Sequence, residues 1–179
     1  MSICKANTRI ITLSVIIVLV FLITGCGGSQ SKSSKSAWNS DELDISRNGN
    51  LKKALKMLQP LADGNVNGSV EQPEARAVKQ KPQNYYGKIV KLEGQIIISN
   101  DKPSDENVSK ELGGKAKEYI LSNTKDATMI DFLYIGPDQY FRDGATVAIY
   151  GYPAGIARIS GNSTALAVVG NKIELISNY

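Results

Sequence analysis

The sequence contains no histidine, and only two of its 179 residues are cysteine. Nucleophilic catalysis of the Ser-His-Asp or Cys-His type is therefore excluded, because both arrangements depend on an imidazole base. Ordinary zinc sites need the same two residue types and are excluded as well. Carboxylate chemistry or a Ser-Lys pair would remain, but no motif in the sequence singles one out. We predict a protein that is not an enzyme and that uses no cofactor and no metal.

Residues 1–25 have the layout of an export signal, in which Lys5 and Arg9 precede an apolar stretch from Ile10 to Ile23. A permanent transmembrane helix is the alternative, but about 14 residues rise only ~21 Å, whereas the hydrocarbon core is roughly 30 Å thick. The segment ends in Ile23-Thr24-Gly25-Cys26. This tetrapeptide resembles the bacterial lipobox, whose cysteine receives a lipid and becomes the first residue of the mature protein.

The resemblance to the lipobox predicts that Cys26 is lipidated with acyl chains such as palmitate. Two or more acyl chains anchor a protein stably, because each buried methylene contributes roughly 0.8 kcal/mol. Cys4 leaves with the signal, so the mature chain has no pair of cysteines for a disulfide. The membrane is therefore the first expected partner of this protein.

Residues 26–40 are predicted to form a flexible tether, because Gly27 to Ser36 are almost entirely Gly, Ser, Gln and Lys. Lys32 and Lys35 could attract anionic lipid headgroups, although a soluble spacer is the plainer interpretation.

The formal net charge of +4 does not belong to the folded part of the chain. The surplus equals the basic residues of the signal and the tether, Lys5, Arg9, Lys32 and Lys35. The chain from Asp41 onward is therefore about neutral and lacks the net basic charge that supplies nonspecific affinity for phosphates. Nucleic acid is accordingly not the expected partner.

Residues 41–81 are predicted to be a helical lead-in. Asn50 is a suitable N-cap, and apolar residues follow it at helical spacing until Pro60 makes continuation costly. This apolar stripe consists of Leu51, Ala54, Leu55 and Leu58. It could rest on the membrane or pack on the main domain, and we favour the domain. A second short helix is predicted from Pro73 to about Gln80.

From Gly87 onward the apolar residues recur with a period of two, which indicates strands. The first strand places Val90, Leu92, Gly94, Ile96 and Ile98 on one face. The segments 118–122 and 128–135 read as a hairpin. Its core face carries Ile130, Phe132 and Tyr134, whereas Asp131 is predicted to point outward.

The pattern continues with a helical turn at Gln139 to Arg142, a strand from Ala145 to Tyr152 and a glycine-rich loop from Pro153 to Asn162. The last strand is predicted from Ala165 to Ile176, with a kink near Gly170. Five short strands with curvature glycines favour a closed barrel, since closure removes exposed edges. We predict a mainly β fold, a five-stranded OB-fold-like barrel over residues 82–179.

Two segments also resemble a known family, the tRNA-anticodon-like OB-fold proteins, many of which are bacterial lipoproteins of unassigned function. Residues 81–94, KPQNYYGKIVKLEG, are similar to the family's Asn-Pro-x-x-Tyr-x-Gly-Lys-x-Val-x-x-x-Gly opening, with Lys81 in place of the usual Asn. Residues 143–151, DGATVAIYG, form the second similar segment. The resemblance covers about Glu74 to Ile176 and implies a fold rather than an activity.

Aromatic residues are the candidate ligand contacts, because OB-type binders use aromatic platforms and the loops beside them. The candidate residues are Tyr119, Tyr150, Tyr152 and Arg158. The candidate surface comprises the loops 100–117 and 153–162 with the sheet face between them. Packing of the tyrosines in the core is the alternative and the one we favour.

These features together predict a lipid-anchored lipoprotein on the extracytoplasmic side of the cell membrane, or in the periplasm or on the outer membrane of a two-membrane cell. We expect it to act as a binding module for an envelope protein or glycan. The alternative is an OB-fold protein that binds single-stranded nucleic acid during DNA uptake or transfer. Hydrolytic catalysis is the least favoured function.

Overall fold

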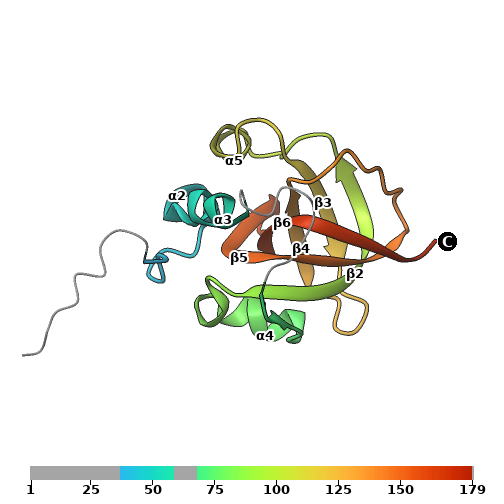
Figure 1. The fold of residues 1–179 in the computed structure, drawn as a ribbon, viewed down its shortest axis with the longest axis horizontal. Coiled ribbons are helices and arrows are strands. Elements are labelled where there is room, and N and C mark those ends of the chain that lie inside the picture. The colour runs from blue at the N-terminus through green and yellow to red at the C-terminus, as the bar shows by residue number, and fades with distance from the viewer. Residues whose placement is uncertain (1–36, 59–67, 179) are drawn as a thin grey trace, which may run out of the picture. The chain divides into compact units, whose positions relative to one another are not determined.

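A ring of five strands forms the centre of the protein in a computed structural model, which describes residues 37–58 and 68–178 (Figure 1). The strands of the ring are β2 (Ile89–Asn100), β3 (Lys117–Ser122), β4 (Met129–Tyr134), β5 (Thr146–Ser160) and β6 (Ser163–Ser177). They pair in the order β2-β3-β4-β6-β5, and β5 pairs again with β2 to close the ring. The short strand β1 (Val70–Glu71) adds a sixth member by pairing in parallel with β2. The predicted mainly β fold with five principal strands is therefore confirmed.

The export signal, Cys26 and most of the tether, up to residue 36, lie outside the described residues. The predictions made for them are therefore not addressed by this structure.

The interior of the ring is the main hydrophobic core. Ile130, Phe132 and Tyr134 of β4 are buried there, as their alternation predicts. Ile98 was predicted to share the core face of β2, and this prediction is wrong. A β-bulge between Ile96 and Ile98 shifts the register, so Ile98 is 46% exposed. An extra residue in one strand moves every later side chain to the other face.

The predicted loop from Pro153 to Asn162 is also wrong, because β5 continues to Ser160 and pairs with β6 throughout. Register shifts beside Pro153 and after Arg158 let this strand bend without losing its partner. Gly155 has a φ of +141°, which a residue with a side chain rarely adopts, and lies close to the backbone of Leu43. After Gly151, β5 no longer pairs with β2. Pro153, which has no N–H to donate, therefore interrupts no hydrogen bond between these two strands.

Short helices flank the ring on several sides (Figure 1). They are α2 (Ile45–Asn48), α3 (Asn50–Leu58), α4 (Ala75–Gln80), the 3₁₀ helix η2 (Pro82–Tyr85) and α5 (Glu106–Glu111). α3 spans the first predicted helix, and its Leu51, Ala54 and Leu58 pack in a second core against strand residues such as Val169. The stripe therefore rests on the domain, as favoured. No helix within residues 37–58 and 68–178 is long and apolar enough to cross a membrane.

The helical turn predicted at Gln139 to Arg142 is wrong, because these residues have no helical structure. The backbone oxygen of Gln139 instead accepts a hydrogen bond from the Tyr119 hydroxyl at 3.0 Å, and Phe141 packs against the core of the ring. These two contacts attach the segment to the core of the ring. The helix that does occur, α5, lies in the β2–β3 connection.

Asn50 does not act as the predicted N-cap but ties the lead-in to the ring. Its side-chain nitrogen donates hydrogen bonds to the backbone oxygens of Asn39 at 3.0 Å and Ala154 at 3.2 Å, and its side-chain oxygen accepts one from the Asn39 nitrogen at 2.8 Å. All of these contacts are at least partly shielded from water. Asn50 therefore fixes both the start of α3 and the middle of β5.

We expect Asn50→Ala to lower the free energy of unfolding by about 1.5 kcal/mol, because it leaves the buried polar partners of the amide unsatisfied. Urea titration followed by circular dichroism measures the change. The exposed Asn84 on η2 supplies the control, and Asn84→Ala should change stability by less than about 0.5 kcal/mol. An equal, small effect of both substitutions would show that the Asn50 contacts do not hold the lead-in.

Candidate functional site

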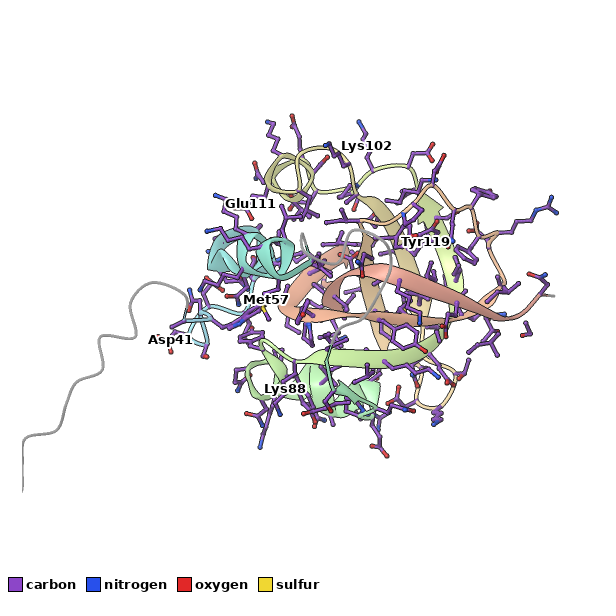
Figure 2. The ribbon with its side chains drawn as sticks, viewed as in Figure 1. Asp41, Met57, Lys88, Lys102, Glu111 and Tyr119 are labelled. Atoms are coloured by element: carbon purple, nitrogen blue, oxygen red, sulfur yellow. The ribbon has the colours of Figure 1, made fainter. Side chains whose placement is uncertain are left out.

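The three candidate tyrosines do not form a common platform. Tyr119 is buried inside the ring, where its ring makes edge contacts with Tyr134 and Phe141. In Figure 2 Tyr119 lies among the strands, whereas Lys102 of the β2–β3 connection lies at the edge of the molecule. Tyr152 is buried in the second core, on the other side of the sheet. Core packing, the alternative we favoured, accounts for both residues.

Tyr150 is the accessible member of the set, yet its surface is already occupied. The ammonium groups of Lys172 and Lys91 lie 4.6 and 5.8 Å from the centre of its ring. Its hydroxyl donates a hydrogen bond of 2.7 Å to Glu174. Burial and this bond to Glu174 raise the pKa of Tyr150 to about 12. Two cations of its own chain therefore already lie against this ring.

Arg158, in contrast, lies beside a cavity of about 350 Å³, which we call the acidic cavity. Its walls come from α2, the β2–β3 connection with α5, and strands β3, β4 and β5. The two segments proposed from sequence, 100–117 and 153–162, therefore meet here, with the outer face of β3 and β4 between them. The lining residues used below are Asp44, Ile45, Arg47, Ser104, Asp105, Val108, Glu118, Asp131, Ala157 and Arg158.

Asp131 of β4 is the unusual group of the acidic cavity. It points to the outer face of the strand, as predicted, but it is only 4% exposed. Leu133, on the same face, packs in one cluster with Ile45 and Val108, so segments from α2 and α5 cover this part of the sheet. The Oδ1 atom of Asp131 is buried and has no hydrogen-bond partner. Such an atom is costly, because a buried polar group loses water without replacement.

Burial, and then the negative charges of Glu118 and Asp105, raise the pKa of Asp131 well above its ordinary value. No cation contributes to this shift in the opposite direction. The carboxyl group is therefore held in a site that opposes its own ionisation. Sites of this kind are frequently functional, since folding alone would favour their replacement.

Glu118 of β3 is buried beside Asp131 and is held firmly by neutral donors. Its Oε2 atom accepts a hydrogen bond of 2.6 Å from the side chain of Asn100. Its Oε1 atom accepts bonds from the backbone nitrogen of Ser104 at 3.1 Å and from the Ser104 hydroxyl at 3.0 Å. These bonds fix the carboxylate in place but leave its charge without a cation.

Two further acids line the cavity. Asp105 accepts hydrogen bonds from the backbone nitrogens of Asn107 at 2.8 Å and Val108 at 3.2 Å, and so caps α5. Asp44 lies 3.6 Å from Arg47. Although burial opposes the shift, hydrogen bonds from Ser46 and the charges of Arg47 and Arg158 hold the pKa of Asp44 below its ordinary value. The negative charge at Asp44 is balanced, whereas that at Asp105 is not.

The acidic cavity can thus accept a hydrogen bond and a positive charge. Among the described residues, no group of three or more Asp, Glu, His or Cys is arranged to hold a metal ion. The sequence patterns pointed to Arg158 and to both segments but missed Asp131 and Glu118. One signal was present, since Asp131 is a single charge within the apolar strand Met129–Tyr134.

The fold and this site define a small, mainly β domain with a closed ring of strands and an acidic cavity on its outer face. No protein-family model matches the sequence, and none of the curated proteins matches it. Among solved structures, an OBody bound to hen egg-white lysozyme is similar, with 11% identical residues and a TM-score of 0.37. The match covers 54% of this chain and 88% of that chain.

Proposed function

We propose that this protein is an exported, lipid-anchored OB-fold lipoprotein that acts by binding an envelope protein or glycan through its acidic cavity. The observation that carries the proposal is the buried carboxyl group of Asp131, which lines this cavity and whose Oδ1 atom has no hydrogen-bond partner. A ligand group that supplies the missing donor would remove the cost of burying that atom. The membrane anchor would hold the domain on the extracytoplasmic side, where such ligands are found.

The strand arrangement supports the OB-fold part of the proposal. An OB-fold is a five-stranded Greek-key barrel. Here five strands close in the order β2-β3-β4-β6-β5, with the single parallel pair of the ring between β4 and β6. The long, bulged strands β5 and β6 supply the curvature that closure needs.

The anchoring part is tested at Cys26, since lipid attached to this residue is the only proposed link to the membrane. We expect Cys26→Ala to abolish labelling by radioactive palmitate and to move the protein from the detergent phase to the aqueous phase in a Triton X-114 partition. Cys4→Ala is the matched control, because Cys4 lies within the signal, and it should change neither result. Palmitate labelling that persisted in Cys26→Ala would refute the assignment.

The binding part is tested with isolated cell envelopes and the lipidated chain in detergent. Ser104 is exposed and lines the acidic cavity, so Ser104→Trp should fill the mouth of the cavity and lower retention by the envelopes at least about tenfold. The control is Gln83→Trp, an equally bulky change at an exposed position on η2. Protease treatment of the envelopes should abolish retention if the ligand is a protein, and glycan hydrolysis if it is a glycan. Equal retention of both tryptophan variants would refute the cavity as the binding surface.

No observation favours the alternative of single-stranded nucleic acid binding. The folded part is about neutral, two of the candidate tyrosines are buried, and the ring of the third lies against two lysines. Salt-sensitive affinity for single-stranded DNA in a filter-binding titration would overturn this conclusion.

A further inference from the structure

The charges around the acidic cavity are not balanced within the protein. Asp105, Glu118 and Asp131 take part in none of the salt bridges between described residues. Arg47 is directed to Glu42 at 3.3 Å and to Asp44 at 3.6 Å. The charge of Arg158 helps to lower the pKa of Asp44, whereas the influences on the pKa of Asp131 all raise it. Both arginines of the cavity thus act on Asp44, and the carboxyl groups of Asp105, Glu118 and Asp131 are left without a paired cation among the described residues.

From this imbalance we infer that the acidic cavity binds a primary ammonium group carried on a carbon chain. The ammonium would donate a hydrogen bond to the carboxyl group of Asp131, which makes no hydrogen bond through Oδ1, and would lie near Glu118 and Asp105. The inference rests on the proposed function, since it names the chemistry of the ligand for the same cavity.

The geometry favours an ammonium over the other cations. A guanidinium is best recognised by both oxygens of one carboxylate. Both oxygens of Glu118 are already occupied by Asn100 and Ser104, and the Oδ1 atom of Asp131 is buried, so Asp131 can offer a ligand only one oxygen. A compact ammonium with rotatable donors suits this single acceptor. No described carboxylates are grouped to hold a metal ion.

The remaining walls of the cavity suit the carbon chain that carries the amine. Ile45, Val108 and Ala157 line the same cavity and belong to the second hydrophobic core. Methylene groups placed against them would gain apolar contact while the charged end reaches Asp131. Binding also has a proton balance: when Asp131 is protonated beforehand, its proton is released to solvent as the ammonium takes its place.

The test is isothermal titration calorimetry of the lipidated chain in detergent, in phosphate buffer. Two amines separate the possible sources: Nα-acetyl-lysine amide represents a protein side chain, and glucosamine represents an amino sugar. Their uncharged counterparts are Nα-acetyl-norleucine amide and N-acetylglucosamine. At least one amine should bind at least about tenfold more tightly than its counterpart, because only the amine supplies charge and donors.

Variants connect the binding to the cavity. Asp131→Asn should weaken the amine at least about tenfold, and Glu118→Gln should weaken it as well, since each removes one negative charge. Asp143→Asn is the matched control at an exposed carboxylate of the β4–β5 connection and should leave the affinity unchanged. Thermal unfolding of each variant establishes that it is folded, and Glu118→Gln remains as a test if Asp131→Asn is not.

The inference would be overturned if neither amine bound, if amine and counterpart bound equally, or if both carboxylate variants kept full affinity. If Ser104→Trp lost envelope retention but the unsubstituted protein bound neither amine, the ammonium ligand would be refuted and the proposed function would stand. Amine binding combined with unchanged retention of Ser104→Trp would support the ammonium site and refute the proposed function.

Discussion

Replacing Gly170 with alanine is expected to lower the free energy of unfolding by about 3 kcal/mol. Gly170 lies on β6, which pairs with β4 on one side and with β5 on the other. A Cβ atom there would overlap the backbone oxygen of Tyr150 and lie 2.7 Å from the ring of Phe132. Neither neighbour can move easily, because Tyr150 belongs to a paired strand and Phe132 is fully buried. Cores of native density do not accept an extra methyl group without displacing atoms.

The control is Gly161→Ala, in the turn between β5 and β6. Gly161 has a φ of +53° and nothing within 4 Å of a Cβ atom, so alanine there meets only the left-handed backbone, at a cost of about 1 to 2 kcal/mol. Urea denaturation of the full chain in detergent, followed by circular dichroism, measures both variants. If Gly170→Ala lowered the free energy of unfolding no more than Gly161→Ala, the strands around Gly170 could move apart to accept a Cβ atom. Crowding would then not be the reason for a glycine at this position.

The features that could be predicted from the sequence are those decided by neighbouring residues. The alternation of Ile130, Phe132 and Tyr134 placed them correctly in the core, because period-two burial is a local property of a strand. The helix from Asn50 to Leu58 followed for the same reason, from apolar residues at helical spacing and a nearby proline. Five principal strands and their closure followed from the count and spacing of such patterns.

The features that could not be predicted depend on partners far away in the chain. Ile98 left the core face because β3 accepts a bulge opposite it, and nothing in the residues around Ile98 encodes that shift. The segment 153–162 reads as a loop from its proline and glycines, but continuous pairing with β6 keeps most of it in a strand. Turn chemistry is outweighed when a partner strand satisfies the backbone.

The acidic cavity illustrates the same limit at the level of the site. Alternation correctly assigned Asp131 to the outer face of β4, but an outer face is exposed only if nothing covers it. Here Ile45 and Val108, from two separate segments, pack over the neighbouring Leu133. Sequence reasoning therefore found the segments that surround the cavity and missed the residue at its centre.

Asp131→Asn is expected to raise the free energy of unfolding, and the gain should grow with pH. Burial and the facing carboxylates raise the pKa of Asp131 in the folded protein, whereas in the unfolded chain this residue has a pKa of about 4. Between these two pKa values the folded state holds a proton that the unfolded state has released. Stability from this residue is therefore lost as the pH rises through that interval. Asparagine does not titrate and keeps the shape of the side chain.

The gain should be close to zero at pH 3 and reach about 2 to 3 kcal/mol at pH 8, the cost of a buried charged group without a partner. The other charged groups of the cavity, Asp44, Arg47, Asp105, Glu118 and Arg158, are present in both proteins, so most of their own pH dependence cancels in the difference. Urea titrations of both proteins from pH 3 to pH 8 measure this difference, with Asp143→Asn as the exposed control.

A gain independent of pH would mean that Asp131 ionises normally in the folded state, which requires a cation or water beside Oδ1. A gain that disappears when a saturating amine is added to the unsubstituted protein would instead connect the cost of this carboxyl directly to its use in binding, since a ligand specific for the folded state stabilises it by mass action.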